Sequence, residues 1–217
     1  MNRDDKDRAL LQRVLMTALA DAPFDGFGPQ LLSAACKANK VDLITKARLF
    51  PAGVMSLVGA FSQWADEQMC TGLDTASLGD MKIRERIAHL VLKRLEVLRP
   101  HKEAARRAGA FLSLPMHAPL AAKLVWRSVD VMWQLAGDRS SDFNFYSKRA
   151  ILAGVYGATL VRWFNDDSED EAPTRDFLAR RITDVMRLER FKAELKTRFA
   201  GEISARSPTP RRRRKRA

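Results

Sequence analysis

The stretch that decides the fold reads LLSAACKANKVD over Leu31–Asp42 and LFPAGVMSLV over Leu49–Val58. Its apolar residues recur at helical spacing, which predicts a first short helix over residues 29–38. Asp42 is placed to cap a second short helix that ends near residues 50–51. A longer helix is expected over residues 53–69. The pattern therefore predicts a helix-turn-helix-like unit within residues 1–70.

The rest of the chain continues the helical pattern, and strand signals are nearly absent. The centre of one helix, Ile151–Val161, is uncharged on every side, which predicts a position in the middle of a bundle. Gly154 and Gly157 within it allow either close helix packing or room for a ligand. We therefore expect an all-α fold. The other expected helices cover residues 4–20, 80–99, 101–112, 119–137, 142–164 and 173–186, the first of them ended by Pro23 and the glycines after it.

The apolar stripe changes direction near Arg187, after a bundle that we place at residues 80–187. A separate amphipathic helix is expected over residues 188–203, with basic residues spread around an apolar side. Such a helix is typical of a membrane interface, and packing on the bundle is the alternative. Residues 204–217 are expected to form a disordered basic tail. The predicted membrane-contacting side chains are Leu188, Phe191, Leu195 and Phe199.

Composition and charge exclude several classes. The chain has 217 residues, of which 46% are hydrophobic and 29% charged, so wholesale disorder is excluded. Its net charge is +12, but seven of the basic residues lie in residues 206–217. Most of the excess positive charge therefore belongs to this C-terminal segment and not to the rest of the chain. The N-terminal residues lack the apolar core of a secretory signal. The longest uncharged run, residues 49–65, is short and broken by proline and glycine, so no membrane span is predicted.

The sequence carries no pattern of enzymatic chemistry. His89, His101 and His117 are isolated, and no Glu-x-x-His pair is present. There is no dinucleotide-binding or phosphate-binding loop, and no nucleophile elbow. We expect a protein that is not an enzyme, with no catalytic residues, metal site or cofactor. Cys36 and Cys70 are too few for a disulfide framework, which favours a reducing compartment such as the cytoplasm.

The N-terminal unit resembles the DNA-binding unit of the tetracycline-repressor (TetR) superfamily. The segment that corresponds to a recognition helix, Asp42–Arg48, begins with an acidic residue. Few Arg, Asn or Gln side chains stand where base contacts are usually made. This argues against sequence-specific DNA binding. A TetR-like transcriptional regulator nevertheless remains the alternative function, and a scaffold that binds only protein is a third.

A second resemblance rests on residues 129–156, VDVMWQLAGDRSSDFNFYSKRAILAGVY, and continues at residues 176–182, DFLARRI. These segments resemble the coenzyme Q protein nine family, accessory lipid-binding proteins of ubiquinone biosynthesis. The resemblance implies a TetR-like helical homodimer that binds isoprenoid quinone intermediates and presents them to demethoxyubiquinone hydroxylase. It implies a peripheral place on the bacterial inner membrane, which corresponds to the matrix side of the mitochondrial inner membrane in eukaryotic relatives.

The resemblance and the apolar stripes together give candidate binding residues. The family's partner-docking patch carries over to Asp130, Phe145, Tyr146 and Arg149, with Phe145 standing where eukaryotic members have Trp. Phe145 and Arg149 share a helix face, so they form either a docking cluster or a packing cluster. The lipid-binding candidates are Leu95, Trp126, Val129, Met132, Trp133, Ile151, Val155, Leu178 and Ile182.

Overall fold

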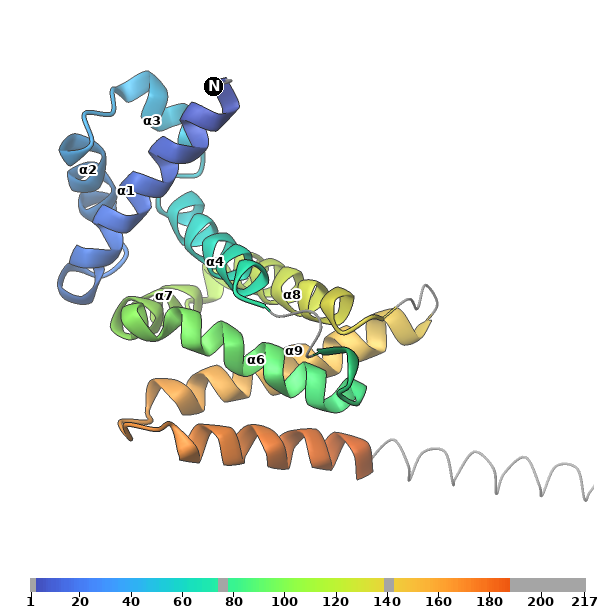
Figure 1. Ribbon diagram of the computed structural model, residues 1–217. Helices are drawn as coiled ribbons and strands as arrows, with labels where there is room; N and C mark the ends of the chain where they lie inside the picture. Colours follow the sequence, from blue (N-terminus) through green and yellow to red (C-terminus); the bar gives the residue numbers. More distant parts are fainter. Residues whose placement is uncertain (1–2, 74–77, 139–142, 188–217) are drawn as a thin grey trace, which may run out of the picture.

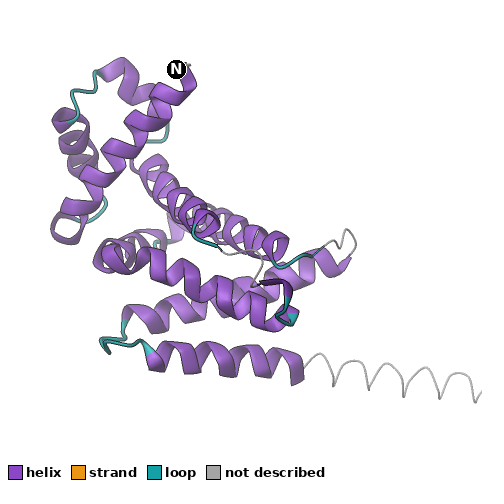
Figure 2. Cartoon of the chain, viewed as in Figure 1, coloured by secondary structure: helices purple, strands orange, loops and turns teal. Residues whose placement is uncertain are grey.

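The computed structural model describes residues 3–73, 78–138 and 143–187, and every regular element in these ranges is a helix (Figures 1 and 2). The expected all-α fold is confirmed. The α-helices are α1 (Arg3–Asp25), α2 (Pro29–Ala38), α3 (Leu43–Leu49), α4 (Val54–Thr71), α6 (Ile83–Leu98), α7 (Lys102–Leu112), α8 (Ala118–Leu135) and α9 (Phe143–Phe164), followed by a helix over residues 172–187. Short 3-10 turns, η1 (Arg99–His101) and η2 (Pro115–His117), precede α7 and α8.

The first three helices form a unit at one end of the molecule, and α4 leads from it into the bundle (Figure 1). The expected end of α1 near residue 20 is wrong, because the helix continues to Asp25 with Pro23 inside it, and of the expected breakers only the glycines after Pro23 can end it. It ends instead at Gly26, whose φ of 65° suits glycine and whose N–H bonds to the Ala22 carbonyl at 2.9 Å. The expected cap of α3 is confirmed, since Asp42 Oδ1 accepts from the Thr45 N–H at 2.9 Å.

Two clusters of buried side chains hold the helices together. One joins α1, α2 and α4 to residues of α6 and α7, with Leu15, Leu57 and Ala104 among its fully buried members. The other lies farther along the bundle, between α6, α8, α9 and the helix over residues 172–187. The N-terminal unit and the near end of the bundle therefore share one core.

The centre of α9 is not buried on every side, so that prediction is wrong. Tyr156 and Thr159 face the core, whereas Gly154 and Ala158 are exposed and Val161 is 62% exposed. A Cβ atom at Gly154 would meet nothing within 4 Å. An uncharged helix surface need not be covered on every side, because the outer face of α9 consists of small and medium-sized apolar residues. Within the described chain this glycine makes no close helix contact.

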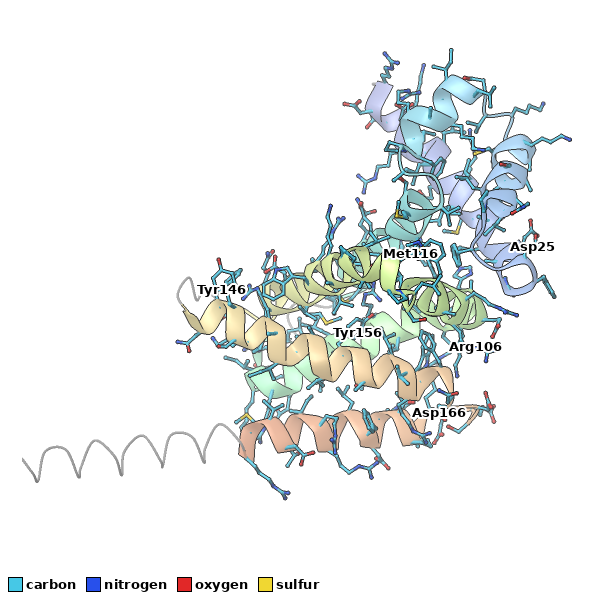
Figure 3. The ribbon with its side chains drawn as sticks, turned by 180° about the vertical axis from the view of Figure 1, so that it is seen from behind. Asp25, Arg106, Met116, Tyr146, Tyr156 and Asp166 are labelled. Carbon is cyan, nitrogen blue, oxygen red and sulfur yellow. The ribbon has the colours of Figure 1, made fainter. Side chains whose placement is uncertain are left out.

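The loop after α9 is fixed by Asp166, which is 3% exposed. Its carboxylate accepts from the N–H groups of Ser168 at 3.2 Å and Thr174 at 2.9 Å, and from both hydroxyls. Burial alone would raise the pKa of Asp166, but these hydrogen bonds outweigh it and lower the pKa to about 2. The loop thereby sets the start of the helix over residues 172–187, which lies beside α9 (Figures 1 and 3).

No single helix within the described ranges has both the length and the hydropathy of a membrane span. Two bent pairs of helices meet those criteria only when each pair is taken together: Leu43–Leu49 with Val54–Thr71, and Ile83–Leu112 with Pro115–Leu135.

Candidate functional site

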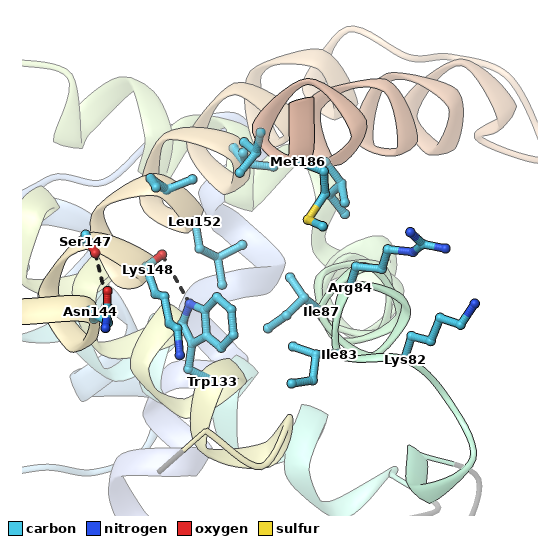
Figure 4. A pocket seen from close by; sticks show the side chains of 14 residues that line it. Lys82, Ile83, Arg84, Ile87, Trp133, Asn144, Ser147, Lys148, Leu152 and Met186 are labelled. Carbon is cyan, nitrogen blue, oxygen red and sulfur yellow. Dashed lines mark hydrogen bonds between the residues drawn. The ribbon is translucent and has the colours of Figure 1, made fainter. Parts of the chain in front are cut away.

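The far end of the bundle contains a cavity of about 630 Å³. It lies where the start of α6, the end of α8, the first half of α9 and the helix over residues 172–187 converge (Figure 4). Its volume is within the range of roughly 300–1,000 Å³ that is usual for small-molecule sites. The lining residues are Lys82, Ile83, Arg84, Ile87, Trp133, Asn144, Ser147, Lys148, Ile151, Leu152, Val155, Ile182, Val185 and Met186.

The inner wall of the cavity is apolar. Ile87 and Leu152 are buried at its back, and the Met186 side chain reaches toward the space from the opposite side (Figure 4). Trp133 offers only its ring, because its indole N–H donates to the Lys148 carbonyl at 3.2 Å. The indole N–H of Trp133 is therefore already used in a hydrogen bond within the protein. The space suits an apolar group.

Four of the nine lipid-binding candidates line this cavity: Trp133, Ile151, Val155 and Ile182. The other five do not. Val129, Met132 and Leu178 are at most 1% exposed within the core cluster of this end, and Leu95 is buried in the other cluster. Trp126 stacks on Tyr146 with ring centroids 6.2 Å apart. Helical spacing identifies an inward side chain, but it does not separate a cavity wall from solid core.

Sequence analysis missed the contribution of α6 to the cavity. Ile83, Arg84 and Ile87 come from its first turns, Lys82 stands directly before it, and Ile83 is 55% exposed. The sequence carries no clear sign of this wall, because a single exposed apolar side chain is ordinary on a protein surface.

Beside the cavity, Arg149 forms a buried charge cluster with two carboxylates. The side chain of Arg149 is 2% exposed; its Nε donates to Asp130 Oδ1 at 2.6 Å and its Nη1 to Asp138 Oδ2 at 3.2 Å. The guanidinium carbon lies 3.4 Å from the centre of the Phe145 ring, so the predicted shared face is confirmed as a direct contact. The Lys148 Nζ also pairs with Asp138, at 2.9 Å.

This burial changes how the candidate docking patch is interpreted. Tyr146 is 62% exposed and projects outward at the start of α9 (Figure 3). Phe145 packs edge-on against it with ring centroids 5.1 Å apart, and the Trp126 ring also stacks on it. The accessible part of the candidate patch is therefore the aromatic surface of Tyr146 and its neighbour Trp126, whereas the guanidinium of Arg149 lies beneath it.

A buried polar network at the junction of α4, α6, α8 and α9 was not predicted. Arg94 donates through Nε to Asp66 Oδ1 at 2.7 Å and through Nη1 to the Tyr156 hydroxyl, and Ser128 donates to Asp66 Oδ2 at 3.2 Å. All four side chains are at most 4% exposed. Burial raises the pKa of Tyr156 to about 12, so the phenol stays neutral. A smaller cavity of about 110 Å³ adjoins this network.

The segment that corresponds to a recognition helix, α3, offers apolar side chains at its start. Leu43 and Ile44 are each 82% exposed. The basic side chains further along α3 are engaged within the unit: the Lys46 Nζ donates to Ser33 Oγ at 2.9 Å, and Arg48 pairs with Asp7. This arrangement lacks the bidentate donors that read base edges.

His101 and His117 make separate contacts with aromatic side chains. His101 packs edge-on against Trp64, and His117 stacks on Phe111. In the part of the chain that the structure describes, no group of three potential metal ligands comes together. The predicted membrane-contacting residues Leu188, Phe191, Leu195 and Phe199 lie outside the described residues, as does the basic tail.

Comparison with known proteins assigns a family domain to most of the residues that line the cavity, but not to those at the start of α6. A model of the COQ9 family matches residues 118–189, which span α8, α9 and the next helix. The rat "Ubiquinone biosynthesis protein COQ9, mitochondrial" is 43% identical over 95 residues, which cover 44% of this chain and 30% of that protein. The proteins of the same name are 29% identical over 191 residues in human and 30% identical over 189 residues in Xenopus tropicalis, covering 85% and 84% of this chain.

The chain spans only part of these relatives, 60% of the human protein and 59% of the frog protein. Among solved structures, a TetR transcriptional regulator from Nitrosomonas europaea matches with a TM-score of 0.63 and 23% identity, over 81% of this chain and 97% of that one. This likeness concerns the fold. Both resemblances found in the sequence are thus confirmed: the chain is homologous to the COQ9 proteins, carries a COQ9 domain at residues 118–189, and has a TetR-like fold.

Proposed function

We propose that this protein serves ubiquinone biosynthesis by binding an isoprenoid quinone intermediate and presenting it to demethoxyubiquinone hydroxylase, without being an enzyme itself. The observation that carries the proposal is the apolar cavity of about 630 Å³ between the COQ9 domain and the start of α6. The names of the relatives indicate the pathway. The apolar lining of the cavity supports a lipid-binding role for this chain in that pathway.

The need for such a cavity follows from the partition of the lipid. Exposing a CH₂ group to water costs about 0.8 kcal/mol, so each five-carbon isoprene unit costs about 4 kcal/mol. A quinone with several such units stays in the bilayer unless a protein offers an equally apolar space. Ile151, Val155 and Ile182 line a space of this kind.

The docking surface and the cavity share structural parts, which suits a protein that hands on its cargo. Trp133 forms part of the cavity wall, and the Lys148 Nζ lies 5.5 Å from the centre of its ring. Lys148 and Arg149 bind the same carboxylate, that of Asp138. A continuous series of side-chain contacts, through Arg149, Asp138 and Lys148, therefore joins the proposed docking surface to the cavity wall.

Membrane contact belongs to the same proposal. We place the protein on the cytoplasmic side of the bacterial inner membrane, as a homodimer held at the surface by residues 188–203. Basic residues near an anionic surface add about 1 kcal/mol each, so residues 206–217 would strengthen the attachment. Flotation with anionic vesicles tests this, since a chain ending at Met186 should lose binding. Undiminished binding would exclude the segment as the anchor.

The experiment for the cavity is lipid extraction from the purified full chain, followed by mass spectrometry. The wild type should carry an isoprenoid lipid. Val155→Trp, which fills the cavity, should reduce its amount at least tenfold. Val161→Trp lies on the same helix at a position that is 62% exposed, so it should retain the lipid. An absence of isoprenoid lipid in the wild type, or equal amounts in both folded variants, would overturn the proposal.

A further inference from the structure

A smaller space with a cationic lining adjoins the apolar cavity. This second space has a volume of about 240 Å³ and is lined by Arg84, Ile182, Thr183, Met186 and Arg187. Three of these residues, Arg84, Ile182 and Met186, also line the large cavity. The two spaces therefore adjoin each other: the larger one is apolar, and the smaller, outer one lies between two guanidinium-bearing side chains.

Positive charge at this outer end exceeds the negative charge available to neutralise it. Glu85 accepts from the Lys82 N–H at 3.2 Å, and its carboxylate lies 3.6 Å from Arg84 Nε. Asp184 pairs with Arg181 at 2.9 Å, so it is committed elsewhere. Among the described residues, no carboxylate lies within ion-pair distance of the side chains of Lys82 or Arg187.

The positions of these cations match the outer end of a bound amphiphile. Figure 4 shows the Lys82 and Arg84 side chains extending from α6 away from Trp133, at the rim rather than in the apolar interior. Lys148, on the other side of the cavity, is paired with Asp138 and adds little net charge. An apolar chain directed toward Trp133 would thus leave its head group between Arg84 and Arg187.

We propose that this site prefers an amphiphile with an anionic head, a phosphate or a carboxylate, over a neutral one of equal chain length. The inference rests on the proposed function only in requiring that the cavity holds an apolar chain. Guanidinium groups bind these anions through paired, charge-assisted hydrogen bonds. A neutral head gains nothing comparable, so the rim discriminates by head group while the chamber supplies the affinity for the chain.

The test compares dodecyl phosphate, dodecanoate and dodecanol by calorimetry and by the fluorescence of the full chain, which includes Trp133. Both anions should bind at least tenfold more tightly than the alcohol at low salt, and 0.5 M salt should narrow this difference. Arg84→Gln with Arg187→Gln should abolish the preference and leave dodecanol binding unchanged. Arg180→Gln is the matched control, because Arg180 is exposed on the same helix and does not line the site.

The outcomes separate this inference from the proposed function. Equal binding of all three compounds would overturn the anion preference and leave the apolar cavity standing. Failure of all three to bind would overturn both. Two further probes distinguish a free phosphate from a lipid head group. Inorganic phosphate alone should not bind measurably to the wild-type protein. Incubation with vesicles of phosphatidylglycerol, but not with vesicles of phosphatidylcholine alone, should load the wild-type protein with phospholipid. Loading from both would contradict the preference.

Discussion

Replacing Arg149 by alanine tests whether this residue is a buried support of the candidate docking patch. Its side chain is 2% exposed and pairs with Asp130 and Asp138. Removing one member of a buried ion pair costs about 3–5 kcal/mol. The lower end applies here, because Asp130 is 28% exposed and Asp138 keeps its pair with Lys148. We therefore expect a loss of about 3 kcal/mol in the free energy of unfolding.

In a domain of this size, 1 kcal/mol shifts the melting temperature by roughly 2–4 °C, so the melting temperature should fall by about 6–12 °C. Circular dichroism during thermal and urea unfolding at pH 7 measures both quantities. Tyr146→Ala is the control: its side chain is 62% exposed, so its effect on stability should stay within about 0.5 kcal/mol. A melting temperature for Arg149→Ala within 2 °C of the wild type would refute the assignment of Arg149 to a supporting position.

Three further predictions concern stability elsewhere in the chain. Asp66→Ala leaves the guanidinium of Arg94 buried without its carboxylate, so urea unfolding should show a loss of about 3–5 kcal/mol. Because the pKa of Asp166 is lowered to about 2 on folding, its stabilisation is complete above pH 4 and is lost as the pH falls toward 2. The stability difference between the wild type and Asp166→Asn should therefore shrink by about 2 kcal/mol between pH 5 and pH 2, and a constant difference would contradict this. Gly53 has φ 57° and ψ −126°, a conformation that side chains resist, so Gly53→Ala should lose about 1–3 kcal/mol in the same unfolding assay.

The helices were predictable because their signals are local. Asp42 marked the start of α3, and the apolar spacing placed the helix over residues 53–69 within two residues of α4. The end of α1 was not predictable in the same way. Proline removes one hydrogen bond, but in the last turn of a helix that loss is small enough for the helix to continue to the next glycine. The residues after Pro23, and Gly26 above all, therefore decide where α1 ends.

The site was less predictable than the fold because it depends on how helices distant in sequence meet. Met132 and Trp133 are neighbours on α8, yet the first is fully buried in the core and the second lines the cavity. Spacing within one helix cannot distinguish these roles, since the difference is made by the side chains of α6 and of the helix over residues 172–187. The burial of Arg149 has the same origin. Its partner Asp138 stands after the end of α8 and meets α9 only in the folded chain.

The N-terminal unit has a structural reason to persist that is independent of DNA. Leu15 on α1 and Leu57 on α4 belong to the same buried cluster as Ala104 and Ala108 on α7. Removing the unit would expose that face of α7 to water, at a cost of about 25 cal/mol for each Å² of apolar surface. The surface of α3 that a regulator would use carries Leu43 and Ile44 instead of base-reading side chains. Packing alone is therefore sufficient to preserve a TetR-like architecture in a chain whose candidate site lies at the opposite end of the molecule.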